Sequence, residues 1–152
     1  MSKTREMRAN IVTALSALPA LAGVSVKPIA MPEDIWFEAN GAPVVGVCYG
    51  GLEAAGPQTS GPREATGTIQ TFLLVVSASG YRSGTESLTM ALGADELAER
   101  VRAVRATPIG PAGQAGVRLL LRSESLMEAP ERTAVGGPIA YVCTYHTTPV
   151  TV

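Results

Sequence analysis

The residue types most often used in catalysis or metal binding are scarce in this sequence. Its one histidine, His146, stands in the segment CTYH, where Cys143 lies three residues earlier. A cysteine and a histidine at this spacing resemble half of a zinc site. Residues three apart on a β-strand point to opposite faces, however, so the pair shares a metal only if the strand is broken there. We therefore expect no metal site, and a histidine on a strand near a sheet edge.

Catalytic arrangements find equally little support. A Ser-His-Asp triad would have to use His146, and the sequence has no G-x-S-x-G turn or comparable nucleophile turn. Glu33 and Asp34 are adjacent after a proline, which is more typical of a solvated turn or a helix start than of an acid and base pair. The glycines of GGLEAAG lack the Lys-Ser/Thr that a phosphate loop requires. The sequence therefore predicts no catalytic residue and no cofactor.

Composition and charge exclude several classes of protein. The chain has 152 residues and a formal net charge of −1. Neither its basic nor its acidic residues are gathered into a block that could bind along nucleic acid or an anionic membrane. Its hydrophobic content is 46%, yet no apolar run approaches the roughly 18 residues of a membrane helix. Cys48 and Cys143 lie in apolar strand-like runs, where we expect reduced, buried thiols. These features predict one soluble domain over residues 1–152 that binds neither specific nucleic acid sequences nor membranes.

The N-terminal segment has two interpretations. A basic start, an apolar run and an A-x-A sequence at residues 20–22 resemble a secretory signal. The same segment fits an amphipathic helix, because apolar residues recur at steps of four, four and three: Met7, Ile11, Leu15 and Leu18. We favour a helix from Thr4 to Leu18, with Thr4 as its N-cap and Pro19 enforcing its end, and a cytoplasmic origin for the chain.

Apolar and turn patterns predict the remaining elements. Valine-rich runs predict strands, and a stretch with Leu97, Val101 and Val104 on one side predicts a second helix. The expected strands are 24–29, 43–48, 68–77, 117–121 and 139–147, and the second helix is 85–105, with its periodicity clearest from Ala94. The order α-β-β-β-α-β-β favours an α+β fold, with a mostly antiparallel four- to five-stranded sheet and both helices on one face.

Two further features suggest contacts with other proteins. Trp36 and Phe37 stand side by side, and Trp36 is either an interface anchor or a core residue. The second and third predicted strands are joined by a long hairpin segment, YGGLEAAGPQTSGPREATG, from Tyr49 to Gly67. Strand connections in compact domains usually have about 2 to 5 residues, so a connector of this length requires an explanation.

Several segments together resemble the tail terminator proteins of tailed bacteriophages. They are REMRANIVTALSALPALAGVSVKP, the valine strand before a glycine-rich excursion, TIQTFLLVVSAS with a helix after it, and the terminal IAYVCTYHT. The resemblance covers nearly the whole chain and rests on element order and hydrophobic pattern. It implies a small α+β subunit without an active site that forms a ring, usually a hexamer, on the last ring of the tail tube. Such a ring stops tail elongation and then joins the tail to the head.

The resemblance also implies partners and a location. The partners would be further copies of the chain, the tail tube protein, the sheath protein if the tail is contractile, and the connector or neck protein on the head side. The protein would assemble in the host cytoplasm and reside in the neck of the virion. Two alternatives stay open: another neck or head-tail adaptor ring, or, in a different class, a small-molecule-binding or catalytic α+β domain.

For the long connector, the resemblance implies a docking loop that points toward neighbouring subunits and the tube. The alternative is a tolerated surface insertion, because lengthening a loop costs little entropy. In the docking interpretation Leu52 is the anchor, since it is the only large apolar side chain there. Charged residues would set the register with a partner. The candidate docking residues are Gly50, Gly51, Leu52, Glu53, Arg63 and Glu64.

Overall fold

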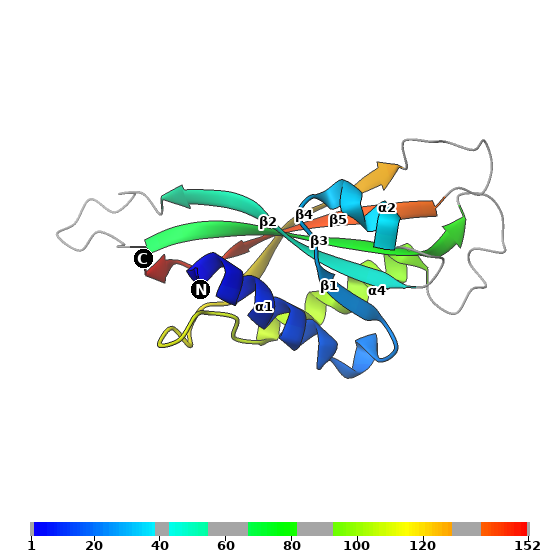
Figure 1. Ribbon diagram of the computed structural model, residues 1–152. Coiled ribbons are helices and arrows are strands. Elements are labelled where there is room, and N and C mark those ends of the chain that lie inside the picture. Colours follow the sequence, from blue (N-terminus) through cyan, green and yellow to red (C-terminus); the bar gives the residue numbers. More distant parts are fainter. Residues whose placement is uncertain (1, 39–42, 55–66, 82–92, 129–137, 152) are drawn as a thin grey trace.

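The computed structural model describes residues 2–38, 43–54, 67–81, 93–128 and 138–151 (Figure 1). In this part of the chain the fold is α+β, as predicted, with three α-helices and a mixed six-stranded sheet. The helices are α1 (Lys3–Ser16), α2 (Ile35–Glu38) and α4 (Ala94–Val101). The strands are β1 (Ser25–Pro28), β2 (Val44–Ala54), β3 (Gly67–Tyr81), β4 (Leu119–Glu128), β5 (Pro138–Thr147) and β6 (Val150–Thr151).

Short 3₁₀ turns join some of these elements. They are η1 (Pro19–Leu21), η2 (Pro32–Asp34), which leads into α2, and η3 (Arg102–Ala106), which continues α4. The second predicted helix therefore tightens after Val101, and its predicted first part, residues 85–92, lies outside the described residues.

The sheet has the strand order β1-β2-β3-β5-β4, with β6 paired to β3. β1 runs parallel to β2, and the other described pairs are antiparallel. The expectation of four to five mostly antiparallel strands is therefore corrected to a mixed sheet of six. A parallel pair requires a crossover of about a dozen residues or more, and here the segment between β1 and β2 crosses over through η2 and α2. The predicted element order lacks α2 and the two-residue β6.

Helix α1 confirms the amphipathic interpretation of the N-terminal segment. Met7, Ile11 and Leu15 are fully buried. The predicted N-cap is wrong by two residues, because Ser2 caps the helix and its hydroxyl oxygen accepts the backbone N–H of Arg5 at 3.1 Å. A serine whose side chain bonds the third helical residue satisfies one of the free N–H groups of the first turn.

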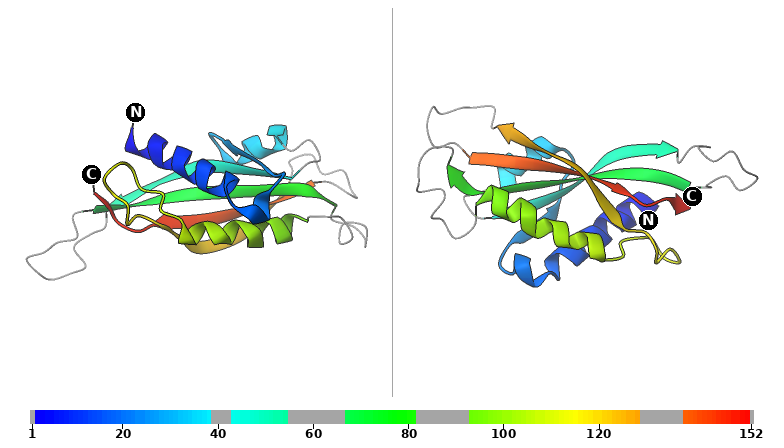
Figure 2. Two further views of the ribbon diagram at one scale, coloured as in Figure 1. Left: turned by 90° about the horizontal axis from the view of Figure 1, so that it is seen from below. Right: turned by 180° about the vertical axis from the view of Figure 1, so that it is seen from behind.

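Alternating side chains on the strands form two apolar clusters on the two faces of the sheet. On one face Phe72, Leu74 and Val76 of β3 pack with buried residues of α1 and α4. On the other face Val75 belongs to a second buried cluster, which includes Ile35 of α2. In Figure 1 the strands of the twisted sheet fan out on both sides of a central crossing, with α1 and α4 in the lower part of the view and α2 in the upper part, and Figure 2 shows α1 and α4 side by side from below.

Candidate docking surfaces

The predicted docking loop begins as part of the sheet. β2 was expected to end at Cys48 but continues to Ala54, and Leu52 pairs with Gln70 of β3. Of the candidate docking residues, Gly50, Gly51, Leu52 and Glu53 therefore lie on a strand, so their placement in a loop is wrong. Arg63 and Glu64 lie outside the described residues. We call the paired ends of β2 and β3, residues 50–54 and 67–71, the arm.

A bulge sets the direction of the arm. The register of β2 against β3 shifts between Tyr49 and Gly51, which leaves one extra residue on β2. Gly51 has a φ of 114°, a backbone conformation that glycine adopts without strain. Bulges of this kind bend a strand and increase its twist. β1 pairs with β2 only from Val44 to Val47, so it leaves the arm part of β2 uncovered on that edge.

The base of the arm meets α1 and the C-terminal strand around a hollow of about 320 Å³. Leu52 is 59% exposed at this hollow. The hydroxyl of Thr4 donates to the side-chain oxygen of Gln70 at 3.5 Å, and the backbone N–H of Gln70 donates to the hydroxyl of Thr147 at 2.9 Å. These bonds tie the arm to the main body of the sheet. The hollow is lined by Lys3, Thr4, Leu52, Thr68, Gln70, Val150 and Thr151.

The α2 segment presents a second exposed apolar surface, on the other face of the sheet. Ile35 is fully buried, Trp36 is half-buried against the second cluster, and Phe37 is 82% exposed. Trp36 is the candidate anchor predicted from the sequence, but Phe37 is the aromatic residue that the structure leaves exposed. Helical geometry gives the signal that would have found it, because successive residues turn by about 100° and three in a row cannot all face the sheet.

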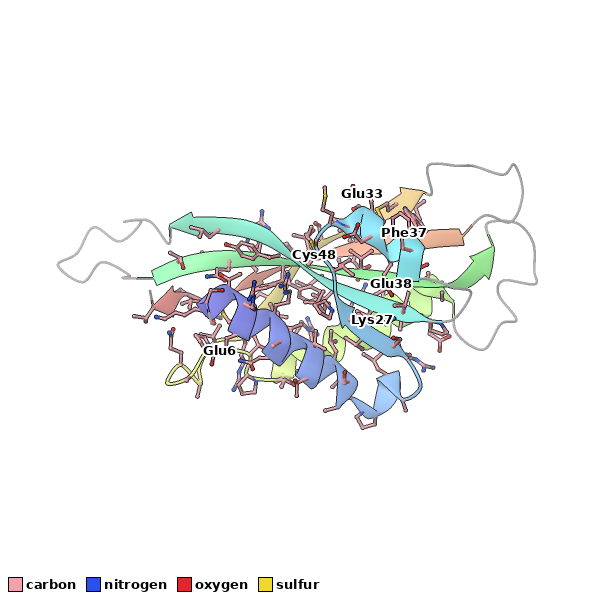
Figure 3. All side chains as sticks on the ribbon, in the orientation of Figure 1. Glu6, Lys27, Glu33, Phe37, Glu38 and Cys48 are labelled. Carbon is pink, nitrogen blue, oxygen red and sulfur yellow. The ribbon has the colours of Figure 1, made fainter. Side chains whose placement is uncertain are left out.

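Glu33 and Asp34 form the start of a helical segment, as expected. Asp34 accepts the backbone N–H of Met31 through its side-chain oxygen Oδ2 at 3.1 Å, and both acidic residues belong to η2. Figure 3 labels Glu33 and Phe37 on this segment and Lys27 on β1. Lys27 forms an exposed ion pair of 2.9 Å with Glu38 at the end of α2. These charges therefore contribute to helix ends and surface pairs.

Cys143 and His146 lie on opposite faces of β5, which agrees with strand alternation. Cys143 pairs with Leu74 and belongs to the cluster beneath the helices, whereas His146 pairs with Thr71. Both cysteines are free and buried, as predicted. Burial raises the pKa of the Cys143 thiol to about 12 and also raises the pKa of the Cys48 thiol. Among the described residues, no three His, Cys, Asp or Glu side chains are placed to hold a metal ion.

A charged pair lies between η3 and β4. Arg102 donates from Nε and Nη2 to one carboxylate oxygen of Glu124, at 2.9 and 2.8 Å, and this bonding raises the pKa of Arg102. Nearby, the hydroxyl of Tyr145 is buried and has no hydrogen-bond partner among the residues that the structure describes. Burial raises the pKa of Tyr145 well above its usual value. This cluster joins η3 to the sheet and lines no part of the hollow at the base of the arm.

No protein-family model and no curated protein matches the chain. In the described part of the chain, the helices are too short or too polar to cross a bilayer. Two exposed apolar surfaces of the described residues are the candidate functional sites: the arm with Leu52, and the α2 segment with Phe37.

Proposed function

We propose that the protein is a structural subunit of a bacteriophage tail, of the terminator type. In this proposal its copies form a ring, with six as the expected number, that caps the head-proximal end of the tail tube. The ring stops elongation and then provides the surface that joins the tail to the head. The subunit has no catalytic role and no cofactor, and it works through its contacts with other proteins.

The arm is the observation that carries this proposal. Strands of 11 and 15 residues are long for a sheet of this size, and their paired ends continue past the region where β1 covers β2. The bonds of Gln70 to Thr4 and Thr147 hold the base of the arm to the body of the fold. Leu52 stands exposed on it. A projecting hairpin with an exposed leucine is suited to reach a neighbouring subunit or the tube.

The sheet edges are consistent with a closed assembly. β1 has only four residues and carries Lys27 and Pro28. β4 has a register shift between Leu121 and Ser123. Short strands, lysine, proline and bulges all discourage open-ended pairing between sheet edges. Contacts between copies would then use the arm and exposed side chains. Ring closure requires head-to-tail contacts, each burying on the order of 2,000 Å² in a permanent ring.

The expected partners follow from this role. They are the tail tube protein, the sheath protein in a contractile tail, and the connector or neck protein on the head side. The protein would assemble in the host cytoplasm and remain in the neck of the virion. Another neck or head-tail adaptor ring would use the same features, and the position of the ring on the tail distinguishes the two.

The test is a pair of matched substitutions. Leu52→Asp places a charge on the arm, and Leu120→Asp places one at a similarly exposed position, 53%, on β4. Both chains should fold, because each side chain already faces solvent. Leu52→Asp should give tails of irregular length or tails unattached to heads in electron micrographs of lysates, whereas Leu120→Asp should give normal particles.

A second variant tests the connector itself. Replacing residues 55–66 by a short turn keeps the described residues of β2 and β3, so the subunit should fold while tail completion fails. Normal particles from both this variant and Leu52→Asp would refute the role proposed for the arm. Mass measurement of the chain mixed with tube protein tests the ring directly.

A further inference from the structure

Two exposed apolar side chains and an acid project together from the segment that ends in α2. Phe37 is 82% exposed and Met31 is 59% exposed, and Glu33 is exposed beside them. We call Met31, Glu33 and Phe37 the knob. The knob is anchored from below, because Ile35 is fully buried under it. A large aromatic side chain left this exposed is typical of a contact site, since aromatic residues dominate the energetics of interfaces.

The same molecule carries a hollow of about 420 Å³ between α1 and β1. Its walls are mostly apolar, and its two charged residues are arginines. The lining residues are Arg5, Arg8, Ala9, Val12, Thr13 and Pro28. An apolar hollow with a few polar groups is the usual form of a site that receives a side chain or small ligand.

The charges of the knob and the hollow are complementary. Arg5 and Arg8 form no ion pair with any residue that the structure describes, and Glu33 forms none there either. By contrast, Lys27 and Glu38, which lie nearby, already neutralise one another. The hollow therefore carries two arginines, and the knob one glutamate, that form no direct ion pair among the described residues, so the two surfaces have opposite charge and can attract one another across an interface.

The knob and the hollow lie next to one another. Pro28 lines the hollow and Met31 begins the knob, and three residues of chain span at most about 11 Å. Within one copy the knob does not occupy the hollow, because Phe37 is exposed and is not among the lining residues. A contact made about a two-fold axis is repeated in reverse, so a second copy whose knob enters this hollow receives the knob of the first copy in its own hollow.

We propose that two copies of the chain pair reciprocally, with the Phe37 side chain of each copy seated in the α1–β1 hollow of the other. Glu33 of each copy then faces the arginines of its partner. This contact goes beyond the ring proposed above and uses neither the arm nor Leu52. Few side chains take part, so the interface is of the small and reversible kind, below about 1,200 Å² in total.

Sedimentation velocity of the purified chain at increasing concentration tests the pairing. The chain should shift from monomer to dimer. Phe37→Ala, and Ala9→Trp, which fills the hollow from an exposed position, should each weaken the dimer by about tenfold or more. Glu33→Arg should weaken it as well. Leu120→Ala removes an exposed leucine, at 53%, from the start of β4 and should leave the dimer unchanged.

Mixing the Phe37→Ala and Ala9→Trp variants gives the decisive measurement. Phe37→Ala keeps an intact hollow and Ala9→Trp keeps an intact knob, so the mixed pair retains one of its two contacts. The mixture should therefore dimerise more tightly than either variant alone. A monomer at every concentration, a dimer that both variants leave intact, or a mixture no tighter than its components would each overturn the proposal. None of these results bears on tail completion, which the Leu52 substitution measures separately.

Discussion

Removing the buried hydroxyl of Tyr145 is expected to raise the stability of the fold, which is the opposite of the usual effect of a tyrosine to phenylalanine change. Tyr145 is fully buried, and its hydroxyl has no hydrogen-bond partner among the described residues. A tyrosine to phenylalanine change normally removes a hydrogen bond and costs stability. Here it removes a polar group that lost its bonds to water on folding and gained none from the described residues in return. Tyr145→Phe should therefore stabilise the fold.

The size of the effect follows from the cost of burying an unpaired hydroxyl. Mutational data place this cost at about 1 to 3 kcal/mol. Part of it is offset by the small gap that the missing oxygen leaves among the neighbouring side chains. We expect a net gain of about 1 kcal/mol in the free energy of unfolding, which raises the melting temperature by roughly 2 to 4 °C for a chain of this length.

Urea denaturation followed by circular dichroism measures this change, with the slope m expected to stay constant. The control is Tyr141→Phe, because the Tyr141 side chain is half-buried and its substitution should change stability by less than about 0.5 kcal/mol. If Tyr145→Phe instead lowers stability by about 1 kcal/mol, the hydroxyl has a bonding partner in solution and the reasoning fails.

Three further predictions concern stability. Because burial raises the pKa of Cys143 from 9.0 to about 12, the folded chain keeps this proton where the unfolded chain loses it, so stability should fall as pH rises from about 9. Cys143→Ala should flatten that slope in urea midpoints measured at several pH values. Asn10 donates to two backbone carbonyl oxygens, so Asn10→Ala should cost about 1 to 2 kcal/mol in the same assay, and Asn10→Asp more, because its carboxylate would face those oxygens. A methyl group on Gly110 would clash with the carbonyl oxygen of Gln114, so Gly110→Ala should lower the thermal midpoint, whereas Gly116→Ala, with open space around it, should not.

The sequence predicts the elements whose periodicity is strong. Met7, Ile11 and Leu15 recur at helical spacing, and burial of one face against the sheet fixes α1 as the pattern requires. The valine-rich cores of β2 and β3 were equally clear. The extension of β2 into the arm was not, because Gly50 and Gly51 carry no side-chain pattern and the strand there is held by pairing with β3. Apolar and polar residues alternate along a strand only where one face of the strand is buried. The arm is only partly buried, so its sequence does not show this alternation.

The candidate surfaces were less predictable for a related reason. Adjacent aromatic residues in a sequence do not reveal which of them faces the core, and the answer for Trp36 and Phe37 depends on the turn that starts at η2. The direction of β1 could not be predicted either, because a strand of four residues has no sequence pattern that distinguishes parallel from antiparallel pairing. The hollow beside Pro28 arises only when α1 packs along β1, so no local pattern predicts it.

The two ends of the described chain meet, because the side-chain nitrogen of Lys3 donates to the backbone oxygen of Thr151 at 3.0 Å. Figure 1 shows both termini at the same end of the molecule as the arm. A short peptide can therefore join the old ends, and new ends can be opened elsewhere without breaking the sheet. Such a circular permutant would carry an affinity tag or fluorescent fusion away from the arm. A fusion at either end of the described chain, by contrast, places its bulk beside the surface proposed to meet the tail.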